Sequence, residues 1–426
     1  MLFRSGFQQS LQNIIVGKLD ETLPPNIIEQ HKLMTLPEAM RNIHFPQSIA
    51  LLRKAEHRLK FEELFYIQLG ILLRQSVRQT RVNGHVFGKV GEMFNRFYHE
   101  KLPFPLTEAQ KRVIREIRKD MGSGKQMNRL LQGDVGSGKT VVALMSMLIA
   151  VDNGYQACIM APTEILANQH YESIAALLDG LPVSVGLLTG STRRSERNNL
   201  HKSLEAGELN ILIGTHALLE DVVKFKNLGF TVIDEQQRFG VLQRAKLWEK
   251  NDDPPHILVM TATPIPRTLA MTLYGDLEVS VIDELPPGRK PVKTIHYTDL
   301  KRNVVFGKIR EQIKAGRQVY VVYPLIKESE KMENLKDLQD GYESIVRAFP
   351  PPEYVTVVVH GQMKPEDKDY SMGLFVQGKA HIMVATTVIE VCVNVPDATV
   401  MLIEIAERCG LSQLHQLRGR VGRGAD

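Results

Sequence analysis

The chain has 426 residues, of which 43% are hydrophobic and 24% are charged, an ordinary composition for a globular protein. This length exceeds what one hydrophobic core supports, so two or three domains are expected. The formal net charge of +5 permits a polyanionic partner without establishing one.

The cysteines and the apolar runs indicate the compartment. Cys158, Cys392 and Cys409 have no metal-ligand spacing, and their odd number argues against a disulfide framework. The longest apolar run, residues 141–151, is too short to cross a bilayer and predicts a buried helix. The first residues carry no export signal. We therefore expect a cytoplasmic protein without a membrane partner.

Residues 36–79 are rich in helix formers and carry apolar residues at helical spacing, which predicts a packing helix. The apolar residues of this stripe are Leu59, Phe61, Leu64, Phe65, Ile67, Leu69, Leu72 and Leu73. Asn83-Gly84 predicts a turn, and the prolines at 103 and 105 predict a rigid connection to the next domain. We expect a helical segment over residues 1–100.

From residue 101 onward, short apolar strands alternate with helical stretches, a pattern that predicts parallel sheets covered on both faces. A stretch with three prolines, residues 284–291, interrupts the pattern and predicts a domain boundary. We expect one α/β domain over residues 101–285 and a second, incomplete one over 286–426. The expected strands are 129–131, 157–160, 211–213, 231–233 and 257–260, then 319–322, 355–359, 382–384 and 399–403.

The segment from Gly133 to Thr140 matches the phosphate-loop pattern G-x-x-x-x-G-K-T, and it follows a strand and precedes a helix. Glycines let backbone N–H groups converge on phosphates at a helix N-terminus, while the lysine adds a positive charge and the threonine a metal-facing hydroxyl. The expected nucleotide ligands here are Gly133, Gly136, Gly138, Lys139 and Thr140.

Two further segments complete the expected ATP site. Asp234 and Glu235 end an apolar strand and point to opposite sides, so Asp234 would hold Mg²⁺ and Glu235 would activate the attacking water. Arg420 and Arg423, three residues apart on an expected helix, would stabilise the charge of the transferring phosphate. By itself, such an arginine-rich segment is more often a basic nucleic-acid patch.

These motifs resemble those of superfamily 2 helicases from Phe104 to the end of the chain. The resemblance implies that Phe104 and Gln110 read the adenine, that Gln416 contacts the nucleotide, and that 261–264 couples hydrolysis to DNA. The residues implied to contact DNA are Thr163, Gly190, Thr215 and His216 in the first α/β domain and His360, Thr386 and Thr387 in the second.

Within that superfamily, segments 233–241, 261–268 and 410–424, with the helix around 58–65, are similar to the RecG family of branched-DNA translocases. The resemblance implies two RecA-like doubly wound parallel-sheet domains in tandem after a helical N-terminal segment. It also implies an ATP- and Mg²⁺-dependent helicase of recombination and repair. The protein would act as a monomer on forked or four-way DNA, independently of sequence, at the bacterial nucleoid. The residues give no signal for a contact with single-stranded-DNA-binding protein.

Three residues depart from the family pattern: Gln237 replaces histidine, Cys392 replaces glycine and Cys409 replaces phenylalanine. A cysteine at a position that needs positive φ would be strained and would impair coupling.

The family's wedge domain and C-terminal element also have no counterpart, so we expect a motor core. Two alternatives stay open: a nucleic-acid-binding module with impaired ATPase activity, and an RNA-directed ATPase of the same superfamily.

Overall fold

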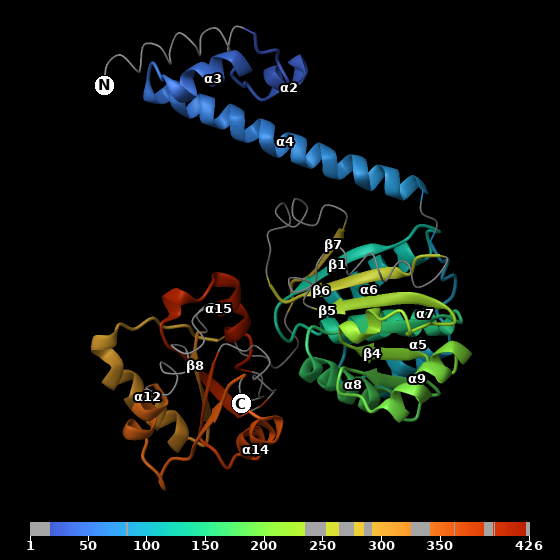
Figure 1. The fold of residues 1–426 in the computed structure, drawn as a ribbon, viewed down its shortest axis with the longest axis vertical. Helices are drawn as coiled ribbons and strands as arrows, with labels where there is room; N and C mark the ends of the chain where they lie inside the picture. Colours follow the sequence, from blue (N-terminus) through green and yellow to red (C-terminus); the bar gives the residue numbers. More distant parts are fainter. Residues whose placement is uncertain are drawn as a thin grey trace. The chain divides into compact units, whose positions relative to one another are not determined.

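The computed structural model describes residues 18–81, 84–234, 253–263, 277–284, 292–324, 341–361, 363–386, 395 and 397–422. The chain divides into two compact units, one that includes the helices before residue 82 and another that contains both β-sheets (Figure 1). In the described part of the chain, no helix is both long and apolar enough to cross a membrane.

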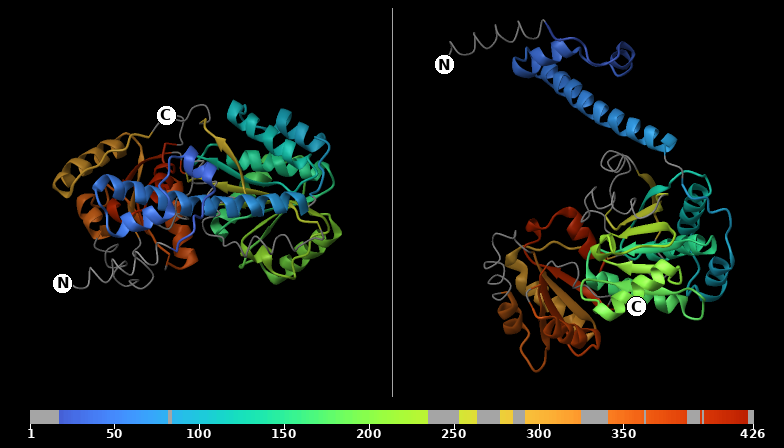
Figure 2. Two further views of the ribbon diagram at one scale, coloured as in Figure 1. Left: turned by 90° about the horizontal axis from the view of Figure 1, so that it is seen from above. Right: turned by 45° about the vertical axis from the view of Figure 1, so that its right-hand side comes forward.

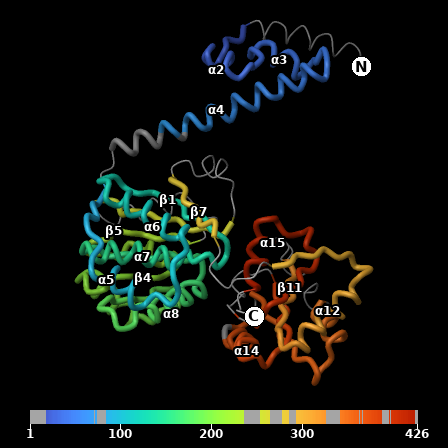
Figure 3. The backbone as a smooth tube through the Cα atoms, turned by 180° about the vertical axis from the view of Figure 1, so that it is seen from behind, coloured from blue at the N-terminus to red at the C-terminus, as the bar shows by residue number. Residues whose placement is uncertain are grey.

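The first unit contains two short helices and one long helix. Its helices are α2 (Pro25–Gln30), α3 (Leu36–His44) and α4 (Ile49–Arg81). The structure places α3 alongside the first part of α4 (Figure 3), where Ala39 and Ala55 are fully buried and let the two helices approach closely. The predicted N-terminal helical segment is thus confirmed.

A buried arginine fixes this unit. The Arg58 side chain on α4 is fully buried and pairs with Glu21 and with Glu62, each at 2.5 Å. Burial alone would raise the pKa of Glu21, but backbone N–H groups and the Arg58 charge hold it below its ordinary value. An unpaired buried charge costs several kcal/mol. This pairing therefore ties the segment before α2 to α4.

The apolar stripe of α4 is only partly buried. Its second half, Leu64, Ile67, Leu69, Leu72 and Leu73, is between 39% and 58% exposed. The prediction of a packing helix is therefore wrong for this half. Helical spacing shows that one face is apolar, and it does not show that a covering element exists within the same unit.

The first sheet has seven strands in the order β3-β4-β2-β5-β6-β1-β7, all paired in parallel. The strands are β1 (Asn128–Gly133), β2 (Gln156–Met160), β3 (Val185–Leu188), β4 (Ile211–Gly214), β5 (Leu228–Asp234), β6 (His256–Thr261) and β7 (Glu278–Ile282). Every residue of β1, β2, β4 and β6 is buried, which requires cover on both faces.

Helices provide this cover. They are α5 (Glu92–Arg96), α6 (Glu108–Met121), α7 (Lys139–Asp152), α8 (Glu164–Leu178) and α9 (Arg194–Ala206). Helix α7 is buried over its whole central part, as expected from the apolar run at 141–151, and it packs against α6, β1, β2 and β5.

The second sheet has the order β11-β8-β10-β9 and is also entirely parallel. Its strands are β8 (Gln318–Tyr323), β9 (Thr356–Val359), β10 (Ile382–Thr386) and β11 (Ala398–Ile403), and its helices are α12 (Arg302–Lys314), α14 (Pro365–Val376) and α15 (Leu411–Arg418). Successive β8 residues alternate between two cores: Val319 and Val321 pack with α12, whereas Tyr320 and Val322 pack with α14 and α15. Helices thus lie on both faces of this sheet (Figure 2).

The fold class predicted from the sequence is confirmed, and each expected strand is present. Strands β3 and β7 were not predicted. They are the two edge strands of the first sheet, and both are only partly buried along their length. Edge strands lack the continuous apolar run that marks a central parallel strand, so the sequence signal is weak there. The domain boundaries at 100/101 and 285/286 stay predictions.

A buried histidine anchors the start of β1. His256 Nδ1 accepts the N–H of Met127 at 2.9 Å, and His256 Nε2 donates to the carbonyl of His85 at 2.8 Å. Only the neutral ring makes both bonds. Burial lowers the pKa of His256 to about 4. The segment that follows α4 is thereby tied to the strand that leads to the phosphate loop.

This contact predicts an acid-sensitive stability. The pKa of His256 is about 4 in the folded chain against 6.5 when free, so the unfolded state binds the proton first as the pH falls. The stabilisation is complete above pH 6.5 and is lost towards pH 4, by roughly 3 kcal/mol in the free energy of unfolding. Urea unfolding followed by circular dichroism measures the free energy of unfolding at each pH. Its decrease from pH 6.5 to pH 4 should be smaller in His256→Gln than in the unsubstituted chain, and unchanged in the control His216→Gln, which replaces an exposed histidine. An equally steep acid loss in His256→Gln would contradict this account.

Candidate active site

The expected ATP-site segments of the first sheet lie at one edge. In a parallel sheet all strands end at the same edge, where such folds bind their ligands. The phosphate loop follows β1, Asp234 ends β5, and Thr263 follows β6, which lies between β1 and β5. With strands about 4.8 Å apart, the loop and Asp234 start roughly 10 Å from each other.

The phosphate loop has the backbone that its glycines allow. Gly136 and Gly138 have φ of 78° and 85°, in the left-handed region that glycine adopts without strain. Gly138 also caps the N-terminus of α7, and a Cβ there would collide with the Gln110 side-chain nitrogen. The loop therefore leads directly into the N-terminus of α7, the end of a helix that favours an anion.

Lys139 and Ser137 line this loop from inside. The Lys139 ammonium donates to the carbonyls of Gly133 and Asp134 at 2.8 and 2.9 Å. The fully buried Ser137 hydroxyl has no hydrogen-bond partner among the described residues. A buried polar group without a partner is rare in proteins, so this cradle fits an oxygen-rich anion.

Gln110 supports the loop from α6. Its amide nitrogen donates to the Ser137 carbonyl at 2.9 Å, and its amide oxygen accepts the Thr107 N–H at 2.9 Å in a capping box. The structure thus uses both ends of this amide within the protein. Phe104, the other residue expected to read the adenine, is 38% exposed. The adenine contacts of both residues stay predictions.

Asp234 is a buried, ionised carboxylate. Its side chain is 13% exposed and accepts a hydrogen bond from His170 Nε2 at 2.9 Å. Burial alone would raise the pKa of Asp234, but the His170 hydrogen bond and the charges of Lys139 and Arg420 hold it below its ordinary value. The Asp234 charge interacts with that of Lys139, the residue before the half-buried Thr140. An ionised carboxylate in this position fits Mg²⁺, which takes one or two carboxylates together with phosphate oxygens.

The C-terminal segment reaches the same edge from α15. Gln416 Nε2 donates to Thr263 Oγ1 at 3.2 Å, and His415 Nε2 lies 3.1 Å from Asp134 Oδ1. Arg420 follows two residues after α15, and its buried Nε atom has no hydrogen-bond partner among the described residues. The structure therefore brings Gln416 and Arg420 to the phosphate-loop edge.

The residues expected to contact DNA also follow strand ends. Thr163 comes after β2, Gly190 after β3, and Thr215 and His216 after β4. In the second sheet, His360 follows β9 and Thr386 ends β10. His216 is exposed, whereas burial lowers the pKa of His360, whose Nδ1 has no partner among the described residues.

Several expected residues lie outside the described residues: Glu235, Thr387 and Arg423, and the departures Gln237 and Cys392. Cys409, the third departure, is half-buried after the short helix η7 (Ala406–Arg408). Burial and the nearby Glu407 raise the pKa of its thiol, which is therefore a weak nucleophile at neutral pH.

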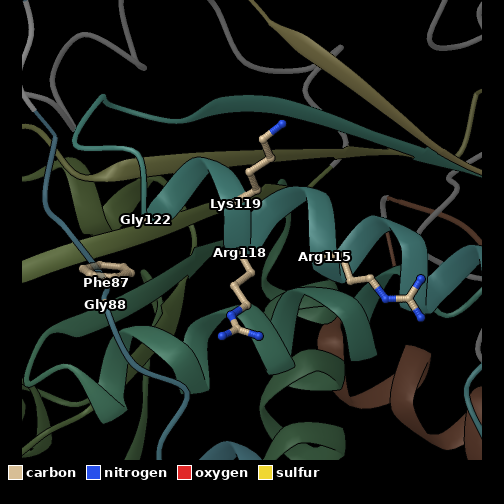
Figure 4. Close-up of a pocket in the computed structure, with 6 residues that line it drawn as sticks. All are labelled: Phe87, Gly88, Arg115, Arg118, Lys119 and Gly122. Carbon is tan, nitrogen blue, oxygen red and sulfur yellow. The ribbon is translucent and has the colours of Figure 1, made fainter.

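One cavity of about 380 Å³ lies away from the phosphate loop, on the last turns of α6 (Figure 4). Arg115, Arg118 and Lys119 line it together with Phe87. In Figure 4, Lys119 extends to the other side of α6 from Arg118, so these cations do not converge on one point. The cavity is therefore basic without being built around a defined anion.

Sequence reasoning missed two residues of the site, His170 and His415. Each is a single histidine inside a helix, and a single helical histidine has no spacing that distinguishes a site residue from a packed one. The three-dimensional structure is needed to show that His170 lies beside Asp234 and that His415 lies beside Asp134.

Comparison with known families fits this geometry. Residues 107–272 match the family model of DEAD/DEAH box helicases, and residues 296–425 match that of the helicase conserved C-terminal domain. The two α/β domains thus have the fold and the motif arrangement of the DEAD/DEAH box helicase class. The chain is 49% identical to the ATP-dependent DNA helicase RecG of Synechocystis sp. over 96% of its length, and 44% identical to that of Escherichia coli K12 over 98%. It belongs to the RecG family.

Solved structures agree. The structure of RecG bound to a three-way DNA junction superposes with a TM-score of 0.78 at 43% identity, over 96% of this chain and 53% of that one. The Saccharomyces cerevisiae protein Dbp5, bound to RNA and ADP BeF3, shares the fold alone, with a TM-score of 0.55 at 16% identity over 79% of this chain and 85% of that one. The chain spans between 49% and 62% of the length of the first RecG relatives.

Gly138→Ala should weaken nucleotide binding, and Gly154→Ala is its matched control. Both glycines have φ near 85°, so either alanine costs about 1 kcal/mol in backbone strain. Only at position 138 does the new methyl group meet Gln110, since nothing lies within 4 Å at position 154. Titration with a fluorescent ATP analogue should show about a tenfold weaker affinity for Gly138→Ala, or about 1.4 kcal/mol, and little change for Gly154→Ala. If both variants changed the affinity for the ATP analogue equally, the prediction would be wrong, because displacement of Gln110 would then not affect the phosphate loop.

Proposed function

We propose that this chain is the motor of an ATP-dependent DNA translocase or helicase that acts on branched DNA. One observation carries the proposal: a phosphate loop with Lys139, the ionised Asp234 and the arginine of the C-terminal segment, Arg420, gather at one sheet edge. This set matches what phosphoryl transfer requires, namely a phosphate cradle, a metal ligand and a cation for the developing charge.

In this proposal, each residue has a definite task at the nucleotide. Backbone N–H groups of Gly136 and Gly138 and the Lys139 ammonium bind phosphate oxygens, while Phe104 and Gln110 face the base. Thr140 and Asp234 would hold Mg²⁺, which neutralises phosphate charge when bound. Glu235 accepts the proton of the attacking water, Gln416 contacts the nucleotide, and Arg420 and Arg423 stabilise the transferring phosphate.

The DNA side of the proposal rests on the strand-end residues. Polar groups after parallel strands can grip sugar and phosphate, which positions a duplex without reading its sequence. The proposed contacts are Thr163, Gly190, Thr215, His216, His360, Thr386 and Thr387. The similar RecG structure is bound to a three-way DNA junction, which supports a branched substrate such as a stalled fork or a Holliday junction.

Domain limits and cellular setting belong to the same proposal. We assign a helical segment to residues 1–100, the ATP-binding domain to 101–285 and the second motor domain to 286–426. We further propose a monomer that works at the nucleoid in the bacterial cytoplasm, where its DNA substrate would lie.

Lys139→Ala tests this function. ATP hydrolysis should rise at least tenfold with a three-way DNA junction, less with single-stranded DNA and least with RNA. Lys139→Ala should lower the junction-stimulated rate by about 100-fold or more, because the ammonium stabilises charge that grows during phosphoryl transfer. Phosphate release measured over a DNA titration reports both effects.

The control and the alternatives follow from the same assay. Lys119→Ala, which removes an exposed ammonium on α6, should leave the stimulated rate unchanged. Stimulated hydrolysis that survives Lys139→Ala would refute the proposed ATP site. Tight DNA binding without stimulated hydrolysis would identify a binding module, and stimulation by RNA alone would identify an RNA-directed ATPase.

A further inference from the structure

Helix α8 carries at its start a residue proposed to contact DNA. Thr163 is the N-cap of α8, and its Oγ1 accepts the Leu166 N–H at 3.4 Å. Ala167, Ile174 and Leu178 on the same helix are buried in the core of the first sheet. Because these buried residues lock α8 to the core, a force on its first turn acts on the helix as a whole.

The same first turn also holds the second proposed DNA-contacting loop. The Glu164 carboxylate accepts the backbone N–H of Ser191 at 3.1 Å and its hydroxyl at 2.9 Å. A Cβ on Gly190 would lie 2.9 Å from Glu164 Oε1, so glycine permits this close approach. Thr163 and the Gly190–Ser191 loop are thus attached to one helix end.

Two turns further along, α8 contacts the nucleotide side of the site. His170 donates to Asp234 at 2.9 Å, and both side chains are largely buried, at 12% and 13% exposed. His170 is seven residues from Thr163, which corresponds to roughly 10 Å along a helix. A single rigid element therefore joins the proposed DNA contacts to the proposed metal ligand.

We propose that α8 couples DNA binding to nucleotide binding, with His170 as a positioning residue for Asp234 and Glu164 as its counterpart on the DNA side. The inference rests on the proposed function and extends it to residues outside the nucleotide and DNA contacts named above. A hydrogen bond depends steeply on angle, so a small shift of α8 redirects or releases the Asp234 carboxylate. Coupling between two sites is reciprocal in binding free energy, and it can therefore be measured without turnover.

The test measures how far a bound nucleotide changes the affinity for DNA. The dissociation constant of a fluorescent three-way junction is determined by anisotropy with and without Mg²⁺ and a non-hydrolysable ATP analogue. For the unsubstituted chain the two constants should differ by about tenfold. In His170→Ala the ratio should fall below about threefold, and His170→Gln, which keeps a side-chain N–H donor, should recover part of it.

The two ends of α8 provide internal controls. Glu164→Ala should lower the same ratio while the nucleotide affinity without DNA stays within about twofold. The double variant Glu164→Ala, His170→Ala should lower the ratio no further than the larger single effect, since the two residues act along one path. Ser173→Ala, an exposed position on the same helix, should leave the ratio unchanged.

Each outcome decides the inference. A ratio in His170→Ala equal to that of the unsubstituted chain would overturn it while leaving the proposed function standing. No difference between the two constants in the unsubstituted chain would overturn both. Thermal unfolding of each variant identifies loss of fold. If His170→Ala unfolds, His170→Leu, which fills a similar volume without an N–H donor, gives the deciding ratio, and a value equal to that of the unsubstituted chain would overturn the inference.

Discussion

Parallel strand pairing is the constraint on which the rest of this structure depends. A parallel sheet must be covered on both faces, and the central strands β1, β2, β4 and β6 are accordingly buried at every residue. The same pairing brings all strand ends to one edge. Polar residues that would be costly within the strands can lie at or just beyond their ends. The phosphate loop, Asp234 and the proposed DNA contacts of the first sheet (Thr163, Gly190, Thr215 and His216) therefore share one edge of that sheet as a consequence of the fold.

The sequence was sufficient to predict those features of the fold that depend only on neighbouring residues. The phosphate loop needs glycine at positive φ, and the central strands need continuous apolar runs, so both were predictable from neighbouring residues. Edge strands β3 and β7 lack that run and were missed. The second half of the α4 stripe was predicted to be packed and is exposed. The sequence shows that this face of the helix is apolar, but it does not show whether another element covers the face.

The site contacts that escaped prediction are those between segments far apart in the chain. His170 and Asp234 are 64 residues apart, and Glu164 and Ser191 are 27 apart, without a motif that links either pair. Their pairing depends on strand order, since β2, which precedes α8, lies between β4 and β5. The periodicity of apolar residues predicts where the strands lie in the sequence, but it does not predict their order in the sheet. The contacts His170–Asp234 and Glu164–Ser191 depend on that order.

Burial of the Asp234 carboxylate explains why such contacts matter. Removing an ionised carboxylate from water is costly unless charges and hydrogen bonds replace its hydration. Here the replacements come from three separate segments: the His170 ring on α8, the Lys139 ammonium of the phosphate loop and the Arg420 guanidinium after α15. The carboxylate's environment is therefore a property of the assembled edge. Any movement of one of these three segments changes the electrostatic stabilisation of the Asp234 carboxylate, which is what the proposed motor needs to link a bound nucleotide to bound DNA.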